Sequence, residues 1–132
     1  MTEQNKIDYW VDIADYDLKT AEAMLETGRF LYVGFMCHQV IEKILKGYFV
    51  FVKNEQPPYI QTLDRLAKMT GLIDEFSENQ KEFIRRLQPL NIEMRYPVYK
   101  EKLLKFLTKE KCEDIITETK ELLKWIKQKL SH

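Results

Sequence analysis

The chain has 132 residues, of which 45% are hydrophobic and 32% are charged, and its 21 basic residues balance its 21 acidic residues. This length favours one domain over residues 1–132, and the composition excludes a disordered chain. A net charge of zero lacks the basic excess typical of nucleic-acid binders. Only four Gly and four Pro interrupt the sequence, which favours long helices over many short strands.

Charge is distributed unevenly along the chain. Residues 1–27 carry two Lys against seven acidic residues, a local net charge of −5. Residues 91–132 carry ten Lys or Arg against seven acidic residues, a local net charge of +3. This asymmetry is compatible with a polarised surface.

The cysteines and the lack of long apolar runs indicate the cellular compartment of the protein. Cys37 and Cys112 lie in apolar helical patterns without metal-like spacing, so we expect buried free thiols. Residues 1–9 lack the apolar stretch of a signal peptide, and no apolar run reaches the roughly 18 residues that span a bilayer. We therefore expect a cytoplasmic protein without a membrane partner and without a cofactor.

Apolar residues at three- and four-residue steps predict two long helices in the first half of the chain. The first covers residues 6–27 and ends at Gly28, a residue that suits a helix C-cap. The second covers residues 30–54 and is apolar almost all round its axis, so we expect it at the centre of the fold. It ends before Pro57 and Pro58.

Residues 62–88 predict two shorter helices. Thr62 is a candidate N-cap for a helix over residues 63–70. Ser77 and Gln80 form a capping-box pattern that opens a helix ending near Gln88.

The last third of the chain predicts an irregular stretch followed by a long helix. Residues 89–107 begin at a proline, are interrupted by Pro97, and hold at most a short helix at their end. A final helix runs from residue 108 or 109 to about Leu130. Since no segment alternates polar and apolar residues, we predict an all-α fold: an antiparallel up-and-down bundle of four long helices plus one or two short ones.

The central helix carries a polar set that is a candidate site: His38, Gln39, Glu42, Lys43 and Lys46. Glu42 precedes Lys46 by four residues, the favourable order for a helical ion pair. His38 and Glu42 share a face, which suits a metal pair or an acid–base pair. Such a polar stripe is more often a set of mutually satisfied partners, and the only other His is the terminal residue, which disfavours a metal.

Arg95 and Tyr96 form a second candidate site between two prolines. A planar guanidinium beside a stacking ring suits contact with phosphates and bases. Arg95 equally suits a structural role, in which it holds the loop through a carbonyl or a carboxylate. The residues alone leave both interpretations open.

Basic rows on the later helices are a third candidate. Lys81 and Arg85 are four residues apart, and Lys120, Lys124 and Lys127 share one face. Such rows can follow a phosphate backbone, but the interspersed Glu residues are more typical of a solvated surface. The sequence has no Gly-rich phosphate loop, zinc-type Cys pair or Ser–His–Asp set.

Four pieces of the sequence recur in a family-like order: Trp10-x-x-x-Ala14-x-x-Asp17-Leu18-x-x-Ala21, the run from Phe35 through His38-Gln39-Val40-Ile41-Glu42-Lys43-Ile44-Leu45-Lys46, Pro57-Pro58, and Arg95-Tyr96-Pro97. In this order and spacing they resemble the HEPN domain over residues 7 to about 128. The resemblance implies a bundle of about five helices that is usually dimeric, and many relatives are partners of small nucleotidyltransferases encoded beside them. Some relatives are RNA-cutting toxins, in which an Arg is followed four to six residues later by a His.

The chain departs from the ribonuclease pattern. The residues four to six positions after Arg95 are Tyr99, Lys100 and Glu101, and no other Arg has a His at that spacing. Relatives often carry His-Asp-Leu after the prolines, where this chain has Gln-Thr-Leu at residues 61–63. Without an imidazole, RNA cleavage loses its usual proton-transfer group.

Together with the missing His, the resemblance therefore implies a non-catalytic HEPN protein that forms a homodimer in a toxin–antitoxin-like module. It would bind a nucleotide, RNA or a nucleotidyltransferase partner. The alternative is a divergent ribonuclease toxin that uses Arg95 without a His. No catalytic residue or metal ligand is predicted. The residues expected to line the binding groove are Gln39, Glu42, Lys43, Lys46, Arg95 and Tyr96.

Overall fold

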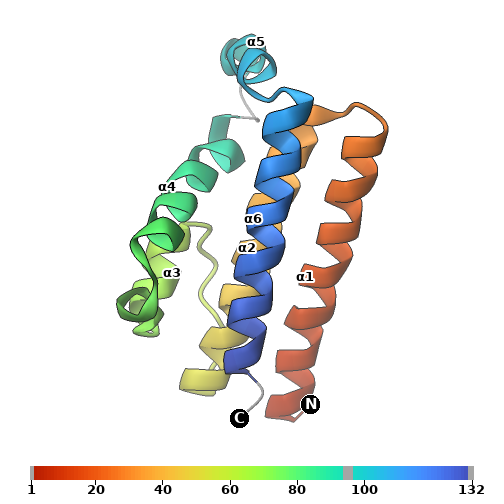
Figure 1. Ribbon diagram of the computed structural model, residues 1–132. Coiled ribbons are helices and arrows are strands. Elements are labelled where there is room, and N and C mark those ends of the chain that lie inside the picture. Colours follow the sequence, from red (N-terminus) through yellow and green to blue (C-terminus); the bar gives the residue numbers. More distant parts are fainter. Residues whose placement is uncertain (1, 94–96, 131–132) are drawn as a thin grey trace.

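The computed structural model describes residues 2–93 and 97–130, with side chains described outside residues 92–100. Every regular element in these residues is a helix (Figure 1). In chain order the helices are α1 (Glu3–Glu26), α2 (Phe30–Lys53), α3 (Leu63–Met69), the 3₁₀ helix η1 (Leu72–Glu75), α4 (Glu78–Glu93), α5 (Pro97–Phe106) and α6 (Lys109–Lys129).

The four long helices α1, α2, α4 and α6 form an antiparallel up-and-down bundle. In Figure 1, α1 and α4 run upward, whereas α2 and α6 run downward. The start of α1 and the end of α6 therefore lie at the same end, and α5 lies across the other. The predicted all-α bundle is confirmed, and the short elements are α3, η1 and α5.

Helix α2 is the central element, as its all-round apolar pattern predicts. It packs against α1, α3, α4, α5 and α6, and Val33 and Ile41 on it are fully buried. Small residues bring α1 close to it. Ala14 of α1 is fully buried, and a Cβ added to Gly47 of α2 would lie 3.1 Å from the Cβ of Trp10.

Most predicted helix ends are confirmed. Gly28 has φ 74°, a conformation open to glycine at little cost. The capping box is reciprocal: the Ser77 amide donates to Gln80 Oε1 at 2.8 Å, and the Gln80 amide donates to Ser77 Oγ at 3.1 Å. Thr108 caps α6 by accepting from the Lys111 amide at 3.2 Å.

The start of α3 differs from the prediction in detail. Thr62 occupies the N-cap position, but its side chain makes no capping hydrogen bond. The Leu63 amide instead donates to Oε1 of Gln88 in α4, at 2.6 Å. A glutamine distant in sequence therefore caps α3 and fastens it to α4.

The segment around the two prolines is more helical than predicted. Helix α4 continues through Pro89 to Glu93, although proline removes one helical hydrogen bond. Burial of Leu87, Leu90 and Asn91 accounts for this extension, since these side chains pack inward on both sides of the proline. Pro97 is the first residue of α5, where a missing N–H costs nothing.

Both cysteines are free and buried, as predicted. Burial raises the pKa of the Cys37 thiol to about 12 and that of the Cys112 thiol to about 11. Neither thiol is therefore an activated nucleophile. In the described part of the chain, no helix has the length and apolar character needed to cross a membrane.

Candidate functional site

The polar side chains of α2 lie among polar residues from two other helices, and together they form a polar cluster. Glu42, Lys46 and Asn91 are only 3%, 8% and 1% exposed. Ionisable groups are rarely buried to this extent unless they are paired. The polar cluster consists of Asp17 from α1, His38, Gln39, Glu42, Lys43 and Lys46 from α2, and Asn91 from α4.

Glu42 is the centre of the charged part of this cluster. Its Oε2 lies 3.0 Å from Lys46 Nζ and 3.8 Å from Lys43 Nζ. Its Oε1 lies 3.8 Å from Nδ1 of His38, which is fully buried. Two ammonium groups beside one carboxylate compensate for the loss of water around it. The predicted pairing within the helix is therefore what the geometry shows for Glu42 Oε2 and Lys46, whereas Glu42 Oε1 accepts no hydrogen bond among the described residues.

An amide chain extends the cluster from α2 to α4. Lys43 Nζ donates to Gln39 Oε1 at 2.9 Å, and Gln39 Nε2 donates to Asn91 Oδ1 at 3.3 Å. Asn91 Nδ2 in turn donates to Oε1 of Gln61, in the connection between α2 and α3, at 2.8 Å. The last turns of α4 are thus held against the middle of α2.

Asp17 adds a second carboxylate from α1. Burial raises its pKa; the nearby Lys43 acts against this shift, whereas Glu42 adds to it. With Asp17 and Glu42 against Lys43 and Lys46, the formal charges of the cluster balance.

Of the predicted site residues, the structure brings together Gln39, Glu42, Lys43 and Lys46. Arg95 and Tyr96 lie outside the described residues, so their place in the groove stays a prediction. Sequence reasoning did not assign a role to Asn91. The sequence feature that could have pointed to Asn91 is its position as a polar residue beside the apolar stripe of α4, where it would be buried.

The surroundings of His38 and Glu42 do not complete a metal site. Among residues 2–93 and 97–130, no group of three His, Cys, Asp or Glu side chains is placed to hold a metal ion.

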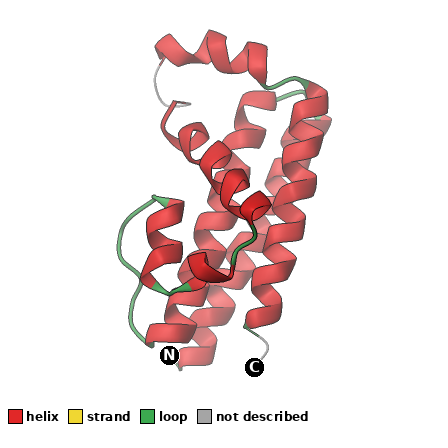
Figure 2. Ribbon diagram, turned by 60° about the vertical axis from the view of Figure 1, so that its left-hand side comes forward, coloured by secondary structure: helices red, strands yellow, loops and turns green. Residues whose placement is uncertain are grey.

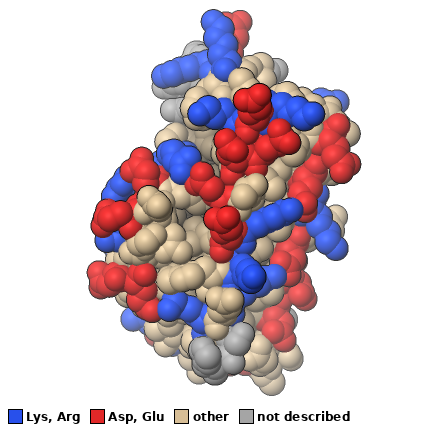
Figure 3. Space-filling model, viewed as in Figure 1, with Lys and Arg blue, Asp and Glu red and all other residues tan. Residues whose placement is uncertain are grey.

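The predicted basic rows face acidic partners. Lys120 pairs with Glu22 at 2.9 Å and Lys127 pairs with Asp15 at 2.5 Å, both across the boundary between α6 and α1. Within α4, Arg85 pairs with Glu82 at 2.7 Å. Figure 3 shows acidic and basic side chains intermixed on this face. Two ion pairs therefore join the acidic α1 to the basic α6 on this face.

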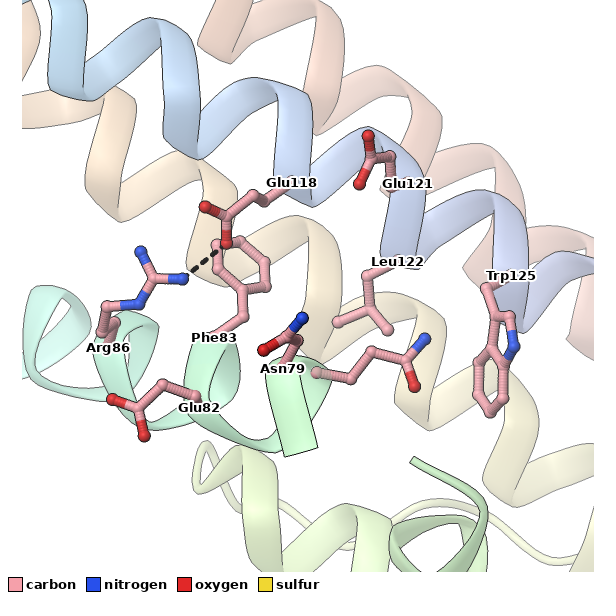
Figure 4. A pocket seen from close by; sticks show the side chains of 9 residues that line it. Asn79, Glu82, Phe83, Arg86, Glu118, Glu121, Leu122 and Trp125 are labelled. Carbon is pink, nitrogen blue, oxygen red and sulfur yellow. Dashed lines mark hydrogen bonds and ion pairs between the residues drawn. The ribbon is translucent and has the colours of Figure 1, made fainter. Parts of the chain in front are cut away.

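A hollow of about 540 Å³ lies between α4 and α6 (Figure 4), and no residue of the polar cluster lines it. Phe83, Leu122 and Trp125 line it together with polar residues, and an ion pair of 2.6 Å between Arg86 and Glu118 crosses it. Acidic groups outnumber basic ones along its lining, which does not suit an anionic ligand.

The fold and the site thus define an all-α bundle whose central, mainly apolar helix carries a polar stripe. The family model of the HEPN domain matches residues 7–129. The chain therefore belongs to the HEPN family, as its motifs predict.

One solved structure supports the same fold. The crystal structure of TT1696 from Thermus thermophilus is similar with a TM-score of 0.79 and 19% sequence identity. The alignment covers 95% of this chain and 98% of that one. No curated protein matches the chain.

Proposed function

We propose that this HEPN protein is a non-catalytic binding protein that takes a phosphate-bearing ligand, a nucleotide or RNA, at the polar cluster. The observation that carries the proposal is the meeting of ammonium and amide donors from α2 and α4 at one level of the bundle. Lys43 combines a full charge with access, since 20% of its side chain is exposed, against 10% for Lys46 and 4% for Glu42.

The charge balance defines what a ligand requires. Two carboxylates offset the two ammonium groups, so an anion needs one more cation to be held tightly. Arg95 follows Asn91 by four residues, and its guanidinium would supply that charge in a planar, bidentate form. The proposed site is therefore the polar cluster completed by Arg95.

Two observations support the non-catalytic part of this proposal. His38 is fully buried, so its ring has no surface to offer to an RNA 2′-hydroxyl. No Arg in the sequence has a His four to six residues later. The homodimer, the nucleotidyltransferase partner and the toxin–antitoxin setting stay predictions of the family resemblance, and the binding proposal does not depend on them.

The test measures the affinity of ADP and of a short single-stranded RNA for the wild type, Lys43→Ala and Arg95→Ala. Hydrogen bonds to charged groups contribute about 1.5–3 kcal/mol, so each variant should bind at least about tenfold more weakly. Lys53→Ala is the matched control, because Lys53 is an exposed lysine near the end of the same helix. Unchanged affinity in both site variants would contradict the proposal.

A second measurement separates binding from cleavage. Total RNA incubated with the protein in the presence of a chelator should stay intact. Cutting that disappears in Arg95→Ala would establish the ribonuclease alternative instead.

A further inference from the structure

A small aromatic pocket opens beside the polar cluster, at the end of α2. Its volume is about 280 Å³, and most of its lining is apolar. One tyrosine in it, Tyr9, is half exposed, so the pocket is accessible. The pocket is lined by Lys6, Tyr9, Trp10, Val50, Gln56 and Pro57.

We propose that this pocket holds the base of a mononucleotide whose phosphates reach the polar cluster, an inference that rests on the proposed function. Aromatic side chains bind bases by stacking, which is favourable for every base because each has a π face. Tyr9 and Trp10 present two rings, with centroids 5.4 Å apart at 78° to each other. A flat ligand can lie against one ring and meet the edge of the other.

Trp10 joins the pocket to the polar cluster. Its ring lines the pocket, and Lys46 Nζ lies 5.8 Å from the ring centroid. Only the Trp10 ring would therefore separate a base in the pocket from the buried ammonium group of Lys46. Lys6, at the pocket itself, adds a second cation.

The spacing along α2 also suits one nucleotide. Val50, Lys46 and Lys43 follow at four- and three-residue steps and so share a face. Seven residues separate Val50 from Lys43, which is about 10 Å along the helix axis at 1.5 Å per residue. A mononucleotide with its base at Val50 must therefore span about 10 Å to place its phosphates at Lys43.

The connection over residues 54–62 borders this face of α2 along the same length. It is the loop that rises along the bundle before α3 in Figure 2. Gln56 and Pro57 line the pocket, and Gln61 bonds Asn91 in the polar cluster. Gln56 Nε2 donates to Tyr59 Oη at 2.9 Å, which leaves Gln56 Oε1 to accept from an amino group on a base.

The test uses the full chain with Trp125→Phe, so that Trp10 is the only tryptophan. Its fluorescence is followed while ADP, ribose 5-phosphate and adenosine are added separately, and calorimetry on the unchanged chain repeats the affinities. One stacked base accounts for roughly a five- to 150-fold gain in affinity, so ADP should bind that much more tightly than ribose 5-phosphate. ADP and adenosine should both quench Trp10.

Tyr9→Ala should remove most of the preference for ADP while leaving ribose 5-phosphate binding unchanged. Tyr16→Ala is the matched control, since Tyr16 lies on the same helix, is 73% exposed and does not line the pocket. It should bind all three ligands as the parent does.

Three results would overturn the base pocket. One is equal binding of ADP and ribose 5-phosphate, with both weakened by Lys43→Ala; this leaves the proposed function standing. Another is ADP binding that is insensitive to Tyr9→Ala. The third is no response of Trp10 to adenosine or ADP. A different result would support the pocket and refute the phosphate site: adenosine quenches Trp10 in a manner that depends on Tyr9, but ADP binds no more tightly than adenosine.

Discussion

Two regions of the molecule use the same charged side chains in opposite surroundings. Between α1 and α6, Glu22 and Lys120 form an ion pair in which both side chains are more than 40% exposed. In the polar cluster, Glu42 and Lys46 are nearly the same distance apart, with 4% and 10% of their side chains exposed. Distance therefore does not distinguish the two pairs, but access to water does.

The consequences of that difference are energetic. Water and salt screen an exposed pair, and removing one partner leaves a charge that water solvates. A buried pair was costly to desolvate, and removing one partner strands the other charge. The exposed pair therefore contributes little to stability, whereas the buried pair, whose two members both lie on α2, makes the fold sensitive to the loss of either member.

The largest expected effect comes from stranding the buried lysine. Glu42→Leu should lower the free energy of unfolding by about 3–5 kcal/mol, because Lys46 then stays buried without its carboxylate. Urea unfolding with linear extrapolation measures this loss.

The double variant Glu42→Leu/Lys46→Met is the control, since it removes both charges while keeping apolar volume. It should recover most of the lost stability. If the double variant were as unstable as Glu42→Leu alone, the loss would come from shape and not from an unpaired charge.

A smaller loss of stability is expected in the uncharged part of the polar cluster, the amide chain of Gln39, Asn91 and Gln61. Asn91→Leu removes the partner of Gln39 Nε2 and one partner of Gln61, and it should cost about 1–3 kcal/mol of unfolding free energy. The exposed Asn79 of the same helix offers a matched substitution, Asn79→Leu, which should change stability by less than about 0.5 kcal/mol. Equal effects at the two positions would show that the amide chain does not stabilise the fold.

Asp17 sharpens the comparison through pH. Because burial raises its pKa in the folded protein, the charged carboxylate destabilises the fold at neutral pH relative to a neutral side chain. Asp17→Asn should therefore be more stable than the wild type at neutral pH. As the pH falls through the raised pKa towards 3.8, the folded wild type takes up the proton first and the difference should shrink.

Thermal or urea unfolding of both proteins from neutral pH to about pH 4 measures this difference. Asp12→Asn is the control, since Asp12 is an exposed acid on the same helix. If the stability difference between Asp17→Asn and the wild type were constant over the whole pH range, the raised pKa of Asp17 would be contradicted.

The sequence predicts the fold well because its signals are local. The 3.6-residue periodicity of α1, α2 and α6, Gly28 and the Ser77 capping box each act within a few residues. The failures are at Pro89 and Thr62, where distant contacts decide. Burial on both sides of Pro89 keeps α4 helical, and Gln88 takes over the cap expected from Thr62.

The contacts of the candidate site likewise divide into local ones, which the sequence reveals, and long-range ones, which it does not. Glu42 and Lys46 are four residues apart, so their pairing is visible in the sequence. The bonds from Gln39 to Asn91 and from Asn91 to Gln61 span 52 and 30 residues. No periodicity encodes contacts of that length, because they depend on how the helices pack. The aromatic pocket, which joins α1 to the connection after α2, was equally hidden.

The smallest expected effect lies at the exposed pair of Glu22 and Lys120. A double-mutant cycle with Glu22→Ala and Lys120→Ala should give a coupling energy of about 0.2–1 kcal/mol. It should fall further in 1 M salt, where the screening length is about 3 Å. The same cycle on Glu42 and Lys46 should give a larger coupling that salt changes little, since those charges are buried. A coupling at Glu22 and Lys120 that matched the buried one and resisted salt would mean that exposure does not control the strength of these pairs.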